Sequence, residues 1–239
     1  MSETRIKLLC LPCAGASAAM YLRWCRFLPT WIELIPIELA GRGPRLGERA
    51  VTRYEQQIAA IINEYSDEMT GNFAFFGHSM GALLANGVTQ ALQNSEASLP
   101  QVLLLSACPA PESFVTRNFP EPANRSALIA SLHEQGGTPV ALFSNPQLLE
   151  MTLAILASDY QVLRSFHYQS QPSLTMPLHL LFGQHDDVSN AQLSDWQKHS
   201  QHKCHYHGFA GGHFFIQSEQ AKVLALITEL LSRYVVLTT

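Results

Sequence analysis

The sequence predicts an α/β fold in which a mainly parallel sheet is covered by helices on both faces. Short apolar runs alternate with amphipathic stretches along most of the chain, which is typical of strands joined by helical crossovers. The chain has 239 residues, of which 47% are hydrophobic and 14% charged. This length and composition suit one large core and exclude a disordered chain. We therefore expect a single domain over residues 1–239.

The expected elements alternate from the first residues onward. Apolar runs predict strands at 6–11, 31–39, 73–76, 102–106, 178–182 and 204–206. Helical spacing or helix-forming composition predicts helices at 18–28, 54–65, 82–94, 192–200 and 219–234. The second helix follows Thr52-Arg53-Tyr54-Glu55, which has the pattern of a capping box. Gly and Pro in segment 40–44 predict a loop after the second strand.

The pentapeptide Gly77-His78-Ser79-Met80-Gly81 is the most informative motif in the chain. It lies between an apolar strand and a helix, the setting in which Gly-x-Ser-x-Gly forms a nucleophile elbow. A side chain in place of either glycine would collide with the neighbouring strand or helix. The motif therefore predicts an α/β-hydrolase fold with Ser79 as the nucleophile, rather than a structural glycine-rich turn.

Residues 109–172 break the alternation. They contain many prolines, the pair Gly136-Gly137 and helix-like stretches at 127–133 and 146–157, but no convincing strand. An insertion between sheet strands at this point would lie over the serine. We expect a helical lid that excludes water and forms an acyl pocket. The alternative is an ordinary set of covering helices.

A serine hydroxyl needs a base to take its proton and a third group to orient the base. This fold supplies them in the order serine, acid, histidine. Gly211-Gly212-His213-Phe214-Phe215 places a histidine after two flexible glycines and before the last helix, so His213 is the predicted base. His78 is held beside the nucleophile and is expected to point elsewhere.

The acid is expected in the turn after the strand at 178–182, where the chain reads Gly183-Gln184-His185-Asp186-Asp187. Two adjacent carboxylates compete for the role. Asp186, the fourth position counted from the glycine, matches the place where this fold usually presents its acid. Asp187 remains the alternative, and the other carboxylate would cap the turn or face solvent.

The oxyanion hole is expected to use the backbone N–H of Met80 and one N–H from the loop after the first strand, with Ala14 as the predicted donor. Cys10 and Cys13 have the spacing of a redox pair, which is a weak signal on its own. Five cysteines, an odd number, argue against a disulfide framework.

A second group of residues that can ligate metals surrounds the strand expected at 204–206. It lacks a paired ligand set at a known spacing, so we expect no metal site there. The predicted serine chemistry also needs no cofactor. The members of this group are His199, His202, Cys204, His205 and His207.

Five features together resemble type II thioesterases, the stand-alone α/β-hydrolases that accompany nonribosomal peptide and polyketide synthases. The resemblance spans nearly the whole chain and is far more specific than the serine motif alone. Two positions depart from the family pattern: Ala16 replaces a glycine of the first loop, and Ala40 a proline before the Gly-Arg-Gly turn. The features are Leu11-Pro12-Cys13-Ala14-Gly15, the helix of Trp24, Gly41-Arg42-Gly43-Pro44-Arg45, the serine pentapeptide and Gly211-Gly212-His213-Phe214-Phe215.

The resemblance implies a thioesterase that hydrolyses acyl groups from the phosphopantetheine thiol of acyl or peptidyl carrier proteins. Such an enzyme would clear mis-primed or stalled chains, or release an intermediate. A general carboxylesterase or lipase acting on small free esters is the alternative. A non-catalytic binding protein on the same fold is a third hypothesis, and the complete Ser-Asp-His set argues against it.

Charge is unevenly distributed along the chain. Residues 1–53 carry eight Lys and Arg against four acidic residues, whereas the whole chain has a net charge of −4. The arginine-rich stretch is a candidate docking surface for an acidic carrier protein or its phosphate, although solvated arginines give the same pattern. Its members are Arg42, Arg45, Arg49 and Arg53.

Partners and location follow from the same composition. Net negative charge argues against nucleic acid as a partner. No apolar run reaches the length of about 18 residues that a membrane span needs, and the first residues lack the pattern of a signal peptide. We expect a cytoplasmic monomer without a membrane partner.

Overall fold

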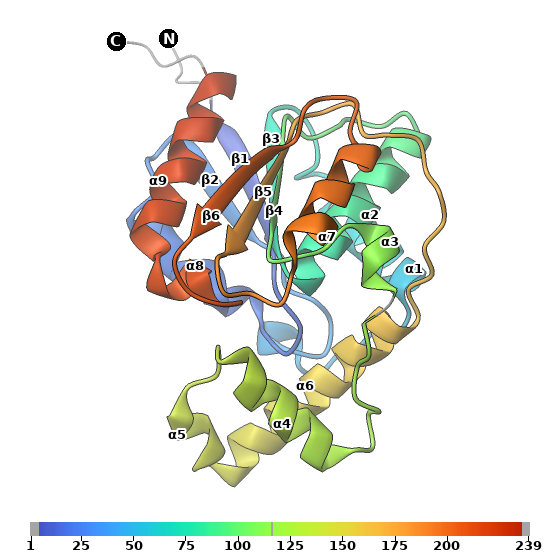
Figure 1. The fold of residues 1–239 in the computed structure, drawn as a ribbon, viewed down its shortest axis with the longest axis vertical. Coiled ribbons are helices and arrows are strands. Elements are labelled where there is room, and N and C mark those ends of the chain that lie inside the picture. Colours follow the sequence, from blue (N-terminus) through green and yellow to red (C-terminus); the bar gives the residue numbers. More distant parts are fainter. Residues whose placement is uncertain (1–4, 116, 236–239) are drawn as a thin grey trace.

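The computed structural model describes residues 5–115 and 117–235. A sheet in the order β2-β1-β3-β4-β5-β6 lies at its centre (Figure 1), and each pair of neighbouring strands is parallel. This arrangement confirms the predicted mainly parallel sheet. The strands are β1 (Ile6–Leu11), β2 (Ile32–Pro36), β3 (Phe73–His78), β4 (Leu103–Ser106), β5 (Leu178–Gly183) and β6 (His205–Phe209).

The central strands are covered on both faces. Every residue of β3 and of β4 is buried, which explains why both read as continuous apolar runs rather than as alternating patterns. In the register of β1 with β3, Leu11 pairs with Gly77. The loop that leaves β1 therefore begins beside the serine pentapeptide.

Two groups of helices cover the two faces of the sheet (Figure 1). One face packs against η1 (Ala18–Arg26), α8 (Phe215–Ser218) and α9 (Gln220–Leu231), with η4 (Ser232–Tyr234) after α9. The other face packs against α1 (Tyr54–Tyr65), α2 (Met80–Asn94) and η3 (Asp195–His199), which follows α7 (Asn190–Ser194). A short turn, η2 (Gly43–Arg45), lies in the loop after β2.

The predicted helical insertion lies between β4 and β5. It contains α3 (Pro111–Phe114), α4 (Arg125–Gln135), α5 (Val140–Phe143) and α6 (Pro146–Arg164), and no strand is found among its described residues. In Figure 1, α4, α5 and α6 form a separate layer, in green and yellow, below the lower end of the sheet. The insertion therefore faces the end of the sheet at which β3 leads into the serine pentapeptide.

Two expected helices differ in type or continuity, and one local expectation was wrong. The segment at 18–28 is a 3-10 helix over Ala18–Arg26, and the segment at 192–200 divides into α7 and η3. The capping box is absent: helix α1 has Arg53 as its N-cap, without a side-chain cap. The Tyr54 N–H donates instead to Ser165 Oγ at 2.8 Å, so a tertiary contact takes over the capping. None of the described helices combines the length and apolar character needed to cross a bilayer.

Candidate active site

Ser79 occupies a sharp turn between β3 and α2. Its backbone has φ 55° and ψ −116°, a strained conformation for a residue with a side chain. A Cβ on Gly77 would lie 2.2 Å from the Gly81 carbonyl oxygen, and one on Gly81 would lie 2.1 Å from the Leu11 carbonyl oxygen. Both positions must therefore be glycine, and the turn is pressed directly against the end of β1.

His213 and Asp186 meet across two adjacent loops. Asp186 follows β5, and His213 follows Gly211, which has φ 101°. A Cβ on Gly183 would lie 2.3 Å from the Gly212 carbonyl oxygen, so the two loops touch. His213 Nδ1 lies 3.0 Å from Asp186 Oδ1 and 3.1 Å from Oδ2. The structure therefore brings Asp186, and not Asp187, into hydrogen-bond contact with His213.

The Asp186 carboxyl is suited to staying ionised. Its side chain is 1% exposed, and this burial acts to raise its pKa. The hydrogen bond and charge of His213 and the Asp187 backbone N–H act in the opposite direction and hold the pKa below its ordinary value. An ionised carboxylate at Nδ1 fixes the imidazole tautomer and orientation.

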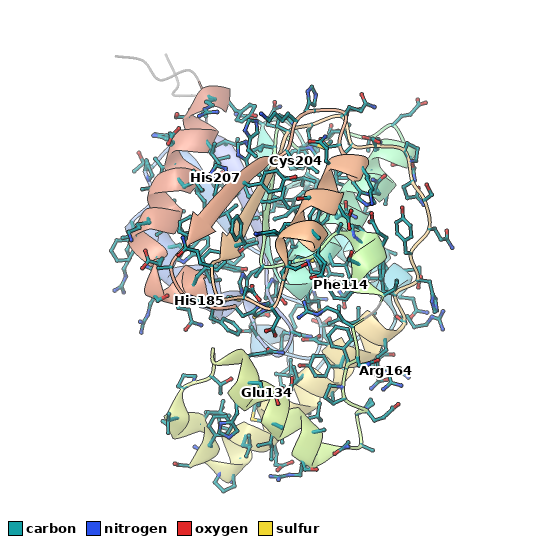
Figure 2. The ribbon with its side chains drawn as sticks, viewed as in Figure 1. Phe114, Glu134, Arg164, His185, Cys204 and His207 are labelled. Atoms are coloured by element: carbon teal, nitrogen blue, oxygen red, sulfur yellow. The ribbon has the colours of Figure 1, made fainter. Side chains whose placement is uncertain are left out.

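A cavity of about 340 Å³ joins these residues. Ser79, Asp186, His213 and Ala14 all line it, together with side chains of the insertion. Glu134 and His185 also line the cavity, and Figure 2 shows His185 at the lower end of the sheet with Glu134 on the insertion below it. The cavity therefore lies between the sheet edge and the helical insertion.

Met80 and Ala14 carry the two backbone N–H groups that the sequence predicts as oxyanion donors. Met80 is the first residue of α2, and such N–H groups have no acceptor within their own helix. Ala14 lies in the loop after β1 and lines the cavity. Within residues 5–115 and 117–235, neither N–H donates to a backbone carbonyl outside the hydrogen bonds within helices and strands.

His78 lies beside the nucleophile but is turned into the core. Its side chain is fully buried, and its Nδ1 lies 2.9 Å from Ser106 Oγ. Burial, and secondarily the charge of His213, lowers the pKa of His78 well below its ordinary value. The ring is therefore neutral and has a packing role in the core next to the turn of Ser79.

The other histidines and the cysteines have separate surroundings. His199 Nε2 lies 2.5 Å from Glu112 Oε2, and His207 contacts His179, whose pKa falls to about 3 through burial and the neighbouring histidines. The part of the chain that the structure describes contains no group of three or more His, Cys, Asp or Glu side chains arranged around a metal position. Burial raises the pKa of Cys13 to about 12, so its thiol stays protonated.

Arg42 contradicts the docking hypothesis for the arginine-rich stretch. Its side chain is 2% exposed and forms a two-pronged ion pair with Asp159 of α6, at 2.7 and 2.5 Å. Arg45 is bonded to Glu48, and only Arg49 and Arg53 of the stretch are exposed. Asp159 is a functional candidate that the sequence patterns did not single out, although a charged residue within the apolar pattern of a helix was a signal available there.

Comparisons with known proteins identify the family of the chain. A family model described as "Thioesterase domain" matches residues 6–231. The chain is 30% identical to Linear gramicidin dehydrogenase LgrE of Brevibacillus parabrevis, over 98% of this chain and 91% of that protein. ClbQ from the colibactin NRPS/PKS pathway superposes with TM-score 0.87 and 28% identity, covering 96% of this chain and 98% of ClbQ. The type II thioesterase BorB from the borrelidin biosynthetic cluster superposes with TM-score 0.86 and 28% identity, covering 95% and 93%.

Proposed function

The chain belongs to the thioesterase family, and we propose that it hydrolyses acyl groups from the phosphopantetheine thiol of carrier proteins. The proposed catalytic residues are Ser79, His213 and Asp186, with the N–H groups of Met80 and Ala14 as the oxyanion hole. The observation that carries the proposal is the contact of His213 Nδ1 with Asp186 in the cavity that Ser79 lines.

The first half of the reaction forms an acyl-serine. Because Asp186 engages Nδ1 of His213, Nε2 is the ring nitrogen that takes the Ser79 proton. Ser79 Oγ bonds to the thioester carbonyl carbon, and the oxyanion hole stabilises the negative oxygen. The C–S bond then breaks, and the thiol leaves with a proton from His213. A thiol with a pKa of about 8.5 leaves more easily than an amine, so it needs little acid catalysis.

The second half releases the acid. His213 takes a proton from water, the resulting hydroxide attacks the acyl carbon, and Ser79 regains its proton as the ester bond breaks. Both halves use the same residues in the same geometry. Neither half draws on a metal or a cofactor.

The helical insertion supplies the acyl pocket in this proposal. Phe119, Tyr160 and Leu163 line the cavity that Ser79, Asp186 and His213 share. A wall of this kind excludes water and limits the shape of the acyl group. We therefore assign residues 109–172 as a lid on a single catalytic domain spanning the chain.

The carrier protein is the proposed partner because two similar structures come from biosynthetic pathways or clusters. ClbQ comes from the colibactin NRPS/PKS pathway, and BorB is a type II thioesterase from the borrelidin biosynthetic cluster. The role here would be editing or release in such a pathway. We propose a cytoplasmic monomer that meets its carrier protein transiently.

Two other activities have less support than the proposed one. A general esterase would use the same residues on small free esters, and only the substrate separates it from the proposal. A dehydrogenase, the activity in the name of LgrE, requires a dinucleotide-binding loop with Gly-x-Gly-x-x-Gly after the first strand. The corresponding loop here reads Pro12-Cys13-Ala14-Gly15-Ala16, with a single glycine, which argues against that activity.

The decisive experiment measures carrier proteins by intact mass before and after treatment with the enzyme. A panel of acyl-loaded carriers should lose the acyl mass and keep the phosphopantetheine. The rate should fall about 10⁴-fold or more in Ser79→Ala, the scale of triad deletions. A serine-directed phosphonate should label Ser79. A higher kcat/KM for p-nitrophenyl butyrate than for every acyl carrier would favour the esterase, and a fully active Ser79→Ala variant would overturn the catalytic assignment.

A further inference from the structure

Three segments far apart in the sequence meet at one buried ion pair. Arg42 comes from the loop after β2, and Asp159 comes from α6 of the insertion. The third segment is the loop after β1: its Gly15 N–H donates to Asp159 Oδ2 at 2.8 Å, and its Ala16 carbonyl accepts from Arg42 Nη1 at 2.9 Å. The pair therefore holds both a donor and an acceptor of this loop.

The same loop is packed against α6 at a second point. Gly15 has φ +78°, and a Cβ there would lie 3.2 Å from Leu156 Cδ1, one turn before Asp159 on the helix. Glycine is therefore needed for both the backbone conformation and the close approach. Ala16 has no positive φ, so the residue that departs from the family pattern fits the loop without backbone strain.

Burial makes a purely stabilising role a poor explanation for this pair. The Arg42 and Asp159 side chains are 2% and 1% exposed, and the cost of removing two charges from water often cancels their attraction. Arg42 Nε also lacks a hydrogen-bond partner in the described structure. What the pair does provide is geometry, because a two-pronged guanidinium–carboxylate contact fixes orientation.

The loop geometry matters because Ala14 precedes the fixed peptide. Gly15 N belongs to the peptide unit that follows Ala14, and Ala14 lines the cavity with Ser79. We propose that Arg42 and Asp159 are positioning residues that aim the Ala14 N–H at the developing oxyanion. Since Asp159 belongs to α6, the oxyanion hole is complete only when the insertion is docked on the sheet.

This inference rests on the proposed acyl-serine mechanism, and its test separates the two. The main variant is the double substitution Arg42→Met/Asp159→Leu, which removes the pair without leaving an unpaired buried charge. With p-nitrophenyl butyrate as substrate, kcat should fall about 10²-fold, the scale of losing one oxyanion donor. KM should change less than about threefold, because the donor acts mainly on the transition state. Amide hydrogen exchange at residues 13–17 should become faster.

A matched control removes another ion pair of the insertion. Arg125 and Glu150 join α4 to α6 and are 57% and 59% exposed, so Arg125→Met/Glu150→Leu should leave kcat and the exchange at residues 13–17 unchanged. If the main variant does not fold, Arg42→Lys keeps the charge but loses the two-pronged contact. It should lower kcat about tenfold at constant KM.

The outcomes are distinct. Unchanged kcat in the folded double variant, or in Arg42→Lys, would overturn the inference, as would a loss of kcat without faster exchange in the loop. A wild-type enzyme that cleaves the free ester but no acyl carrier would contradict the proposed substrate while leaving this inference open to the same measurements. Slow turnover together with a loosened loop, absent from the control, would establish the positioning role.

Discussion

The side chains of Asp186 and Asp159 are each 1% exposed, and each is bonded to one basic side chain. Asp186 holds His213, and histidine is the side chain type that exchanges a proton near neutral pH. Asp159 holds Arg42, and arginine stays charged at any working pH. Asp186 and His213 line the cavity, whereas Asp159 and Arg42 lie behind it and contact backbone groups.

The two pairs show that the role of a buried carboxylate depends on its basic partner and on its distance from the cavity. Asp186 orients His213, which carries protons in the proposed reaction. Asp159, together with Arg42, holds the backbone of the loop after β1 in one conformation. Both tasks serve the same transition state in our proposal, one through the base and the other through the oxyanion donor.

Of the changes to the two buried carboxylates, the larger effect is expected from removing the charge of Asp186. Asp186→Asn should lower kcat about 10⁴-fold, as in a protease triad in which the same change favours the wrong histidine tautomer. This is about a hundred times the loss expected for Arg42→Met/Asp159→Leu. Steady-state kinetics on p-nitrophenyl butyrate and on an acyl carrier would measure both.

Asp187→Asn is the matched control for that substitution. Asp187 is exposed and has no hydrogen bond from His213, so this variant should lose less than about tenfold in kcat. The reverse pattern, with Asp187→Asn the crippled variant, would make Asp187 the orienting acid and leave the contact of Asp186 without a catalytic role.

The arginines of the stretch at 42–53 differ in burial: Arg42 is buried, whereas others lie on the surface. Arg49 and Arg53 are exposed, so Arg49→Glu/Arg53→Glu should raise KM for acyl carrier up to about tenfold and reduce its salt dependence, since steering charges act mainly on association. Turnover of a small thioester should stay nearly unchanged. Kinetics at two ionic strengths would measure this effect.

The control for the surface arginines is Lys203→Glu/Lys222→Glu, which changes the net charge equally at two other exposed positions. A similar rise in KM in this control would mean that net charge, rather than the Arg49 and Arg53 surface, governs the encounter. An equal loss of activity on small thioester and carrier would mean that the arginines shape the active site.

Sequence patterns anticipated the features that depend on short-range geometry. The strand-turn-helix around Ser79 needs two glycines at fixed positions, and the turn after β5 presents Asp186 three residues after Gly183, so both can be recognised within a few residues. Arg42 and Asp159 are separated by 117 positions, and no local pattern links them. The start of α1 shows the same limit, because the Tyr54 N–H donates to Ser165, 111 positions away, a contact that no local pattern indicates.

The smallest expected effect concerns acid stability and tests the ionic state of Asp186. Its pKa is lower in the folded protein than the value of about 3.9 for an unfolded chain. A carboxyl of this kind adds stability that is fully present above the unfolded pKa and is lost as the pH falls through the folded pKa.

The measurement compares the melting temperatures of wild type and Asp186→Asn across pH. Because asparagine cannot titrate, the melting temperature of wild type relative to Asp186→Asn should decrease as the pH falls below about 4. Each kcal/mol of lost stability shifts it by about 2–4 °C. The offset between the two proteins at neutral pH is immaterial, because the test lies in the sign of the change with pH. A difference in melting temperature that stays constant or grows toward acid would mean that Asp186 is not stabilised in its charged form and cannot hold His213 as proposed.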